Sequence, residues 1–160
     1  INSTSPIHLS SVHINGLKFW VGKETATYCP DVVPSCPNGT QTQVGVSTGS
    51  DTVYANTIVP GGQAVYVAGD GSLSVTVAHS GSTGENGLRA PFQYTPQAGE
   101  DDVGSLDFND LEWAACPNGE EGVYQIFADG SPNFDTADHP NCIGIALGPV
   151  ISDSQSVWQY

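Results

Sequence analysis

The sequence predicts an all-β protein, a single secreted domain over residues 1–160 that folds as a compact antiparallel β-sandwich or β-barrel with two disulfides. Three observations predict this fold class. Short β-branched and aromatic runs are separated by turn signals about every 8–12 residues. Few stretches run far without Gly or Pro, so helix signals are nearly absent. The four cysteines are an even number, as is typical of an exported protein with disulfides.

The first predicted strands form a hairpin near the start of the chain. Residues 8–14 partly alternate and end at Asn15-Gly16, a pair that favours a tight turn before residues 17–21. Further along, residues 52–59 form a strand that runs into the turn Pro60-Gly61-Gly62.

The clearest hairpin lies in the middle of the chain, where residues 64–67 and 73–77 flank Gly69-Asp70-Gly71. Residues 79–105 are rich in Gly, Ser and acidic side chains, and we expect long surface loops there. The last predicted strands are 122–128, 143–147 and 156–160.

A β-trefoil is the minority alternative. Three similar triplets, Phe19-Trp20-Val21, Val65-Tyr66-Val67 and Tyr124-Gln125-Ile126, recur along the chain. Their spacings are unequal and their flanks do not match, so a threefold repeat is disfavoured.

The charge balance excludes several classes of partner. The chain has 17 acidic residues against Lys18, Lys23 and Arg89, which gives a formal net charge of −14. Nucleic-acid binding depends on Lys and Arg at the phosphates, and anionic lipid attracts basic segments. We therefore expect no nucleic-acid partner. No window of about 18 apolar residues is present, so we also expect no membrane insertion.

The cysteines are best interpreted as structural. Four cysteines allow three pairings, and we favour Cys29–Cys36 and Cys116–Cys142 because both close local loops. Loop closure gives about 2.5 kcal/mol for the first pair and about 3.5 kcal/mol for the second. Their intervals do not fit the short ligand spacings of zinc sites.

Two glycosylation sequons accompany the cysteines, at Asn2-Ser3-Thr4 and Asn38-Gly39-Thr40. We expect a secreted glycoprotein with Asn2 and Asn38 as acceptors.

No residue set reaches a catalytic signature. Gly45-Val46-Ser47-Thr48-Gly49 matches the pattern of serine hydrolases, but that chemistry needs a strand-turn-helix elbow, which the sequence does not predict. The chain has four histidines, His8, His13, His79 and His139, and the acids Asp135 and Asp138 lie close to His139 in the sequence. These side chains could bind a cation only if the fold brings them together. We expect no catalytic residue, no metal and no cofactor.

Acidic residues cluster between Glu100 and Glu112. A calcium loop that starts at Asp107 fails, because Glu112 stands where the loop needs Gly. A glycosidase carboxylate pair would need two carboxyl groups about 5 Å apart, which a sequence does not reveal. We expect solvated loop acids.

Most aromatic residues lie in predicted strands and are expected in the core. Tyr94, between Pro91 and Pro96, is the best candidate for an aromatic residue on a loop that stacks on a sugar. We take Tyr94 and His79 as candidate ligand contacts.

Several segments, in order along nearly the whole chain, carry a resemblance to a known family. They are Ser5-Pro6-Ile7-His8-Leu9, Lys18-Phe19-Trp20-Val21, Ala26-Thr27-Tyr28-Cys29-Pro30, Cys36-Pro37, Val59-Pro60-Gly61-Gly62-Gln63-Ala64-Val65-Tyr66-Val67, Ala78-His79-Ser80, Pro91-Phe92-Gln93-Tyr94-Thr95-Pro96, Ala115-Cys116-Pro117, Tyr124-Gln125-Ile126-Phe127-Ala128, Cys142 and Trp158-Gln159-Tyr160. With these segments the chain resembles the fungal phialide cell-wall proteins, the PhiA-like family, also described as IgE-binding allergens.

The resemblance implies a secreted, wall-associated protein linked to conidiophore development and hyphal growth, with no established reaction and no catalytic residues to transfer. The expected partners are cell-wall polysaccharide or wall proteins. The alternative is an effector or elicitor that a plant host receptor recognises, and a third option is a small wall-glycan lectin or hydrolase.

Overall fold

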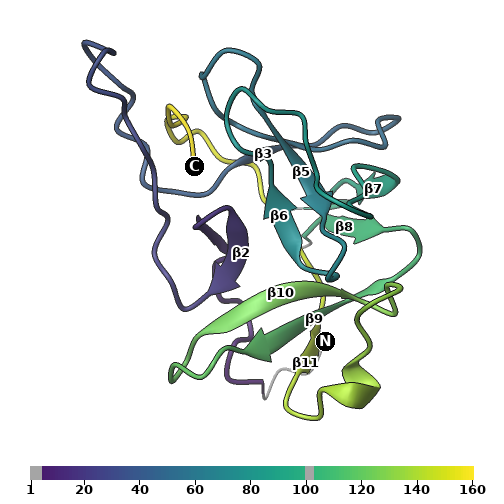
Figure 1. Ribbon diagram of the computed structural model, residues 1–160. Coiled ribbons are helices and arrows are strands. Elements are labelled where there is room, and N and C mark those ends of the chain that lie inside the picture. Colours follow the sequence, from purple (N-terminus) through teal and green to yellow (C-terminus); the bar gives the residue numbers. More distant parts are fainter. Residues whose placement is uncertain (1–4, 100–102) are drawn as a thin grey trace.

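The computed structural model describes residues 5–99 and 103–160. Within these residues, nine strands form one curled antiparallel sheet in the order β11-β9-β10-β2-β6-β5-β4-β3, with β1 paired to β2 off this path. β7 and β8 form a small second sheet. Figure 1 shows β9, β10 and β11 at one end, β3, β5 and β6 at the other, and β2 beside them. The predicted all-β, antiparallel fold class is confirmed.

The strands are short, and one 3₁₀ helix interrupts them. Their bounds are β1 His13–Asn15, β2 Lys18–Val21, β3 Val44–Gly45, β4 Tyr54–Ala55, β5 Gln63–Val67, β6 Leu73–Val75, β7 Phe92–Thr95, β8 Ser105–Phe108, β9 Glu112–Pro117, β10 Tyr124–Asp129, η1 Thr136–Asp138 and β11 Ile143–Ile145.

The first predicted hairpin is present, with its turn one residue later than expected. Asn15 pairs with Lys18, so the loop residues are Gly16 and Leu17, and both have left-handed backbone with φ 58° and 64°. Two consecutive left-handed residues define the turn whose twist suits a hairpin. Residues 8–12, expected to be part of the first strand, lie outside β1.

The predicted hairpin around Gly69-Asp70-Gly71 is confirmed as β5 and β6, with Val65 opposite Val75 and Val67 opposite Leu73. Gly71 has φ 82°, and a Cβ there would meet Phe134 at 2.5 Å, so both the turn and the packing require Gly. Strand β6 is buried throughout and β5 nearly so, which places this hairpin at the centre of the core.

The loop prediction for residues 79–105 is wrong at residues 92–95. Phe92–Thr95 forms β7 and pairs with β8, with Phe92 opposite Phe108 and Tyr94 opposite Leu106. The many Gly, Ser and Pro residues of this region indicated a loop. A four-residue strand nevertheless forms, because Phe92 and Tyr94 are enough to bury one of its faces.

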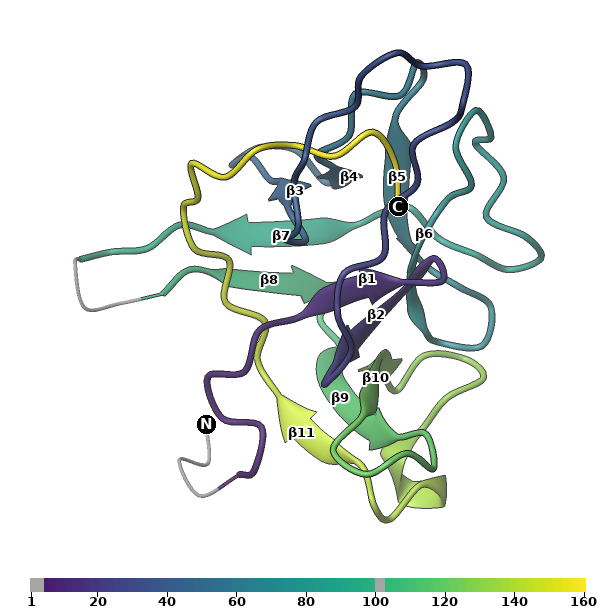
Figure 2. The same ribbon diagram turned by 90° about the vertical axis from the view of Figure 1, so that its left-hand side faces the viewer.

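Of the two strands predicted at the end of the chain, only the first is present. Residues 143–145 form β11, but residues 156–160 make isolated bridges, Thr57 with Val157 and Tyr28 with Gln159. Figure 2 shows this last segment, in yellow, running from β11 past β8 and β7 to end beside β5.

Tyr160 is held where that segment ends. Its main-chain N–H donates to Gln63 Oε1 (2.8 Å), and its hydroxyl accepts from the Gln43 N–H (2.9 Å). Burial raises the pKa of the Tyr160 phenol above its usual value. Gln63, fully buried, also donates to the Thr76 carbonyl (2.8 Å), so the buried amide is satisfied.

The core lies inside the curl and under the small sheet. Phe92 and Phe108 meet edge to face at 4.9 Å between ring centroids, and Trp113 donates its Nε1–H to the Leu106 carbonyl (2.7 Å). The largest fully buried apolar side chains are Trp113, Phe92, Phe108, Ile14, Leu73, Ile126, Val65, Val75 and Val157.

The two disulfides join Cys29 to Cys36 and Cys116 to Cys142, the pairs that loop closure favours. The three triplets of the trefoil alternative fall on β2, β5 and β10, which all belong to one continuous sheet, so that alternative is wrong. In residues 5–99 and 103–160, no helix has the length and apolar content needed to cross a membrane.

Candidate functional site

The surface contains an open cleft of ≈ 600 Å³ at the β3–β6 end of the sheet. We call it the Arg89 cleft. Its lining includes Tyr54, Gly61, Thr76, His79, Ser80 and Arg89.

Neighbouring strands fix the floor of the Arg89 cleft. Tyr54 on β4 pairs with Ala64 on β5. Thr76 follows β6, and its Oγ1 accepts from the Ala64 N–H (3.0 Å) while its own N–H donates to the Ala64 carbonyl (2.9 Å). A turn closes one side, where the Gly62 N–H donates to the Val59 carbonyl (2.9 Å). The cleft is therefore formed by hydrogen-bonded backbone.

Arg89 and Tyr54 form the polar feature of this cleft. Arg89 Nη2 donates to the Tyr54 hydroxyl (2.7 Å), and the guanidinium carbon lies 5.4 Å from the Tyr54 ring centroid. Tyr54 keeps 44% of its surface exposed. An aromatic face beside fixed hydrogen-bond donors suits a small polar ligand with an apolar side.

His79, a predicted ligand contact, lines the same cleft. It is exposed and has left-handed backbone with φ 63°, in a turn where the Ser80 N–H donates to the Val77 carbonyl (3.0 Å). A non-glycine residue in that conformation is uncommon, although His is one of the types that tolerate it. Its role in ligand contact stays a prediction.

Tyr94, the other predicted contact, lies elsewhere. It is half-buried on β7, on the face that also holds Phe92, and it packs against the core rather than standing on a loop. The prolines around it, which suggested a loop, instead flank a strand. Ligand contact through Tyr94 stays a prediction.

Sequence reasoning did not select Tyr54 and Arg89. They are 35 residues apart, and only the pairing of β4 with β5 and of Leu88 with Val67 brings them together. One signal was available, because Arg89 is the single arginine in a strongly acidic chain.

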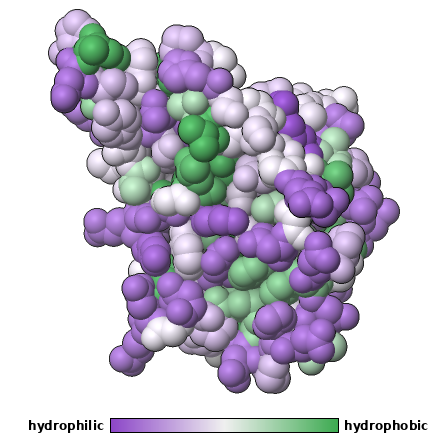
Figure 3. Space-filling view, viewed as in Figure 1, coloured by the Kyte–Doolittle hydropathy of each residue, from purple (hydrophilic) through white to green (hydrophobic). Residues whose placement is uncertain are grey.

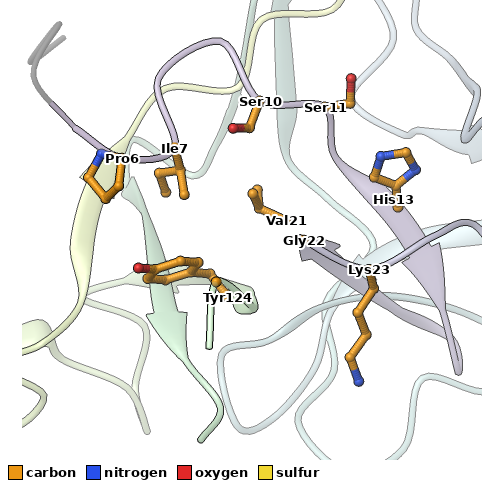
Figure 4. Close-up of a pocket in the computed structure, with 10 residues that line it drawn as sticks. Pro6, Ile7, Ser10, Ser11, His13, Val21, Gly22, Lys23 and Tyr124 are labelled. Carbon is orange, nitrogen blue, oxygen red and sulfur yellow. The ribbon is translucent and has the colours of Figure 1, made fainter. Parts of the chain in front are cut away.

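A smaller hollow, ≈ 330 Å³, lies between the first described residues and the β2–β10 pair. Figure 4 shows Ile7, Val21 and Tyr124 gathered around it, with Lys23 extending away from them. Lys23 Nζ instead lies 4.1 Å above the Trp20 ring. This hollow has both apolar and polar lining, the latter including Ser10, Ser11 and His13, but among the described residues it holds no hydrogen-bonded pair of an arginine and a tyrosine like that of the Arg89 cleft.

A serine, a lysine and an aspartate meet at the β5–β6 turn. Lys18 Nζ donates to Ser72 Oγ (2.5 Å), and Ser72 Oγ donates to Asp70 Oδ1 (2.5 Å). Ser72 is 0% exposed, so no substrate can reach its hydroxyl. These three side chains therefore stabilise the turn and do not form a reactive site.

Burial would raise the pKa of Asp70, but the two hydrogen bonds from Ser72 and the nearby Lys18 outweigh this effect and hold that pKa below its usual value. Burial, with a contribution from Asp70, raises the pKa of Tyr66.

The other sequence candidates do not assemble into a site. Ser47 donates its hydroxyl to the carbonyl of the next residue, and the next element after it is the strand β4, not a helix. Asp135 caps η1, and His139 stacks on Phe134 at 4.8 Å. Residues 5–99 and 103–160 contain no group of three His, Cys, Asp or Glu that could hold a metal ion.

The acidic run and the sequons are only partly described. Asp107 accepts from Ser105 Oγ (2.9 Å), while residues 100–102 lie outside the described residues. Asn38 is exposed, as an acceptor must be, and Asn2 lies outside the described residues. Figure 3 shows a largely hydrophilic face with apolar colour in separate small areas.

Comparison with known proteins finds secreted relatives. A family model described as PhiA-like secreted protein matches residues 1–160. An uncharacterized secreted protein of the fungus Arthroderma benhamiae is 32% identical over 154 residues, which cover 91% of this chain and 74% of that relative. No solved structure matches.

Proposed function

The chain belongs to the PhiA-like secreted protein family, and from that premise we propose a wall-associated protein that contacts glycan through the Arg89 cleft and contributes to wall and conidiophore development. Its partners would be wall polysaccharide or wall proteins. The protein would work by binding and not by turning over a substrate.

The observation that carries the proposal is the Arg89 cleft itself. It combines an exposed Tyr54 ring with hydrogen-bonding groups from Arg89, His79 and Ser80, on a floor held by β5 and the segment after β6. Sugar rings offer an apolar face and several hydroxyls, and such a cleft matches both properties.

We test glycan contact by titrating labelled protein with chitohexaose, laminarihexaose and mannohexaose, following backbone amide shifts by NMR. Shifts should cluster on the residues of the Arg89 cleft. Tyr54→Ala should weaken binding by about 5-fold or more, because truncation of an aromatic anchor in a binding interface costs on the order of 1 kcal/mol or more.

Tyr28→Ala is the matched control. Tyr28 is also an exposed tyrosine, but it lies at the bridge with Gln159 and outside the Arg89 cleft. Equal glycan affinity of wild type and Tyr54→Ala would show that the Arg89 cleft is not the binding site. An absence of amide shifts with every glycan would contradict glycan contact itself. Release of reducing ends during incubation would contradict a binding role.

A second candidate, recognition by a plant host receptor, is supported by one loop. The loop closed by Cys29–Cys36 carries Val32, 88% exposed, between Pro30 and Pro34, which is a stiff apolar tip. Infiltration of pure protein into leaves should then give a defence response that Val32→Asp abolishes. A response equal for both proteins would exclude this loop as the recognised element.

A further inference from the structure

We infer that the Arg89 cleft selects glycans that carry a carboxylate, such as a hexuronic acid unit, over neutral chains. The inference rests on the proposed glycan contact and adds the chemical class of the bound sugar. It follows from the state of Arg89, the charge of its surroundings and the rigidity of its support.

Arg89 has donors to spare. A guanidinium carries five N–H donors in a planar fork, and the described residues accept one hydrogen bond from it, at the Tyr54 hydroxyl. No carboxylate of the described residues lies within ion-pair distance of Arg89, whereas Lys18 has Asp70 at 3.7 Å. The free edge of the fork matches the two oxygens of a carboxylate.

The Arg89 cleft is a local exception to the charge of the molecule. The chain carries 17 acidic side chains, yet none of the described residues that line the cleft is Asp or Glu. The lining groups that bear or can gain charge are Arg89, His79 and Tyr54. A carboxylate in the cleft would therefore meet a cation and a histidine, and no acidic side chain among the described lining residues.

The support of Arg89 is rigid on both sides. The residue before it, Leu88, exchanges two backbone hydrogen bonds with Val67 of β5 (2.8 and 2.9 Å). The side chain is fixed at its far end by Tyr54, whose strand β4 pairs with β5. Because the fork is already oriented, binding a carboxylate costs little ordering entropy.

Two trisaccharides test the inference, one with free carboxylates and one in which each carboxyl is a neutral methyl ester. Calorimetry compares α-1,4-trigalacturonate with its fully methyl-esterified form, against the full-length protein. The acid should bind at least 10-fold more tightly than the ester, because a bidentate, charge-assisted pair is stronger than a neutral hydrogen bond. Arg89→Gln should abolish this preference, and Arg89→Lys should keep part of it, because Lys lacks the fork.

Lys23→Gln is the matched charge control. It removes one positive charge outside the Arg89 cleft, so the preference for the acid should persist. Thermal unfolding of each variant verifies that Arg89→Gln remains folded.

The outcomes separate the two proposals. Equal affinity for acid and ester, or a preference that survives Arg89→Gln, would overturn the carboxylate inference while leaving neutral glycan contact intact. Failure of these trisaccharides and of the neutral hexasaccharides to bind would overturn the proposed function as well.

Discussion

Asp70 shows how a single side chain fixes a turn in this protein. Its carboxylate accepts from the Ser72 N–H (3.0 Å) and the Ser72 hydroxyl (2.5 Å), and Lys18 lies 3.7 Å away. Burial alone would raise the pKa of Asp70, yet these partners together hold it below the usual 3.8. A carboxyl group with a lowered folded-state pKa stabilises the fold above its unfolded pKa, and that stability is lost as the pH falls through the folded value.

Asp70→Asn should therefore destabilise the protein at pH 7 and cease to do so in acid. Asn keeps the shape and one acceptor oxygen but removes the charge. Because the Asp70 side chain is 63% exposed, we expect no more than about 1 kcal/mol at pH 7. Urea unfolding at pH 7, 5 and 3 should show the difference from wild type closing below about pH 4. A difference that is constant across these pH values would mean that shape, and not charge, holds the turn.

At the scale of elements, local signals predicted some turns and missed others. The β5–β6 hairpin was predictable because Gly69-Asp70-Gly71 is a strong turn signal between two apolar runs. The connection between β8 and β9 was not, because its left-handed residues are Asn109 (φ 49°) and Asp110 (φ 56°) with no Gly. Asn and Asp tolerate that conformation, so Asp110, which is exposed as expected of a loop acid, also forms a tight turn that the sequence did not predict.

The two disulfides differ in what they hold together. Cys29–Cys36 closes a separation of 7 residues in an exposed loop, while Cys116–Cys142 closes 26 residues and ties β9 to the segment before β11. Cys116 is 8% exposed and shares a small buried cluster with Ala114 and Phe134. Both loop length and packing make the second disulfide the more important one.

We expect Cys116→Ala/Cys142→Ala to lower the free energy of unfolding by about 3.5 kcal/mol or more, against about 2.5 kcal/mol for Cys29→Ala/Cys36→Ala. Urea unfolding of each double variant gives the comparison, with the other disulfide intact as the internal control. If the Cys29/Cys36 variant loses as much stability, loop length is not the deciding factor.

At the scale of the whole molecule, long-range pairing decides both the fold and the site. The sheet path passes from β10 to β2 to β6, strands far apart in sequence, and the last segment crosses the molecule to place Tyr160 against Gln63. Periodicity reports which residues are buried but not against what, so neither this path nor the meeting of Tyr54 with Arg89 could be predicted. The fold class could be, because alternation and turn chemistry are local properties.

Charge acts on the same scale. With a net charge of −14 and one ion pair between side chains of the described residues, Lys18–Asp70, repulsion among acidic groups is only weakly offset. Salt screens that repulsion, since the Debye length falls from about 30 Å at 0.01 M to about 8 Å at 0.15 M. Added salt should therefore stabilise the compact state at neutral pH.

We expect the Tm at pH 7 to rise by about 2–4 °C, which corresponds to about 1 kcal/mol, when NaCl is raised from 0.01 to 0.15 M. The rise should disappear near pH 4.1, where the net charge approaches zero and there is little repulsion left to screen. Calorimetric scans at both pH values measure this, and KCl should give the same result because screening does not depend on the identity of the cation. A Tm that falls with salt at pH 7 would show that attraction within local charge clusters, such as the one at Asp70, outweighs the repulsion of the whole surface.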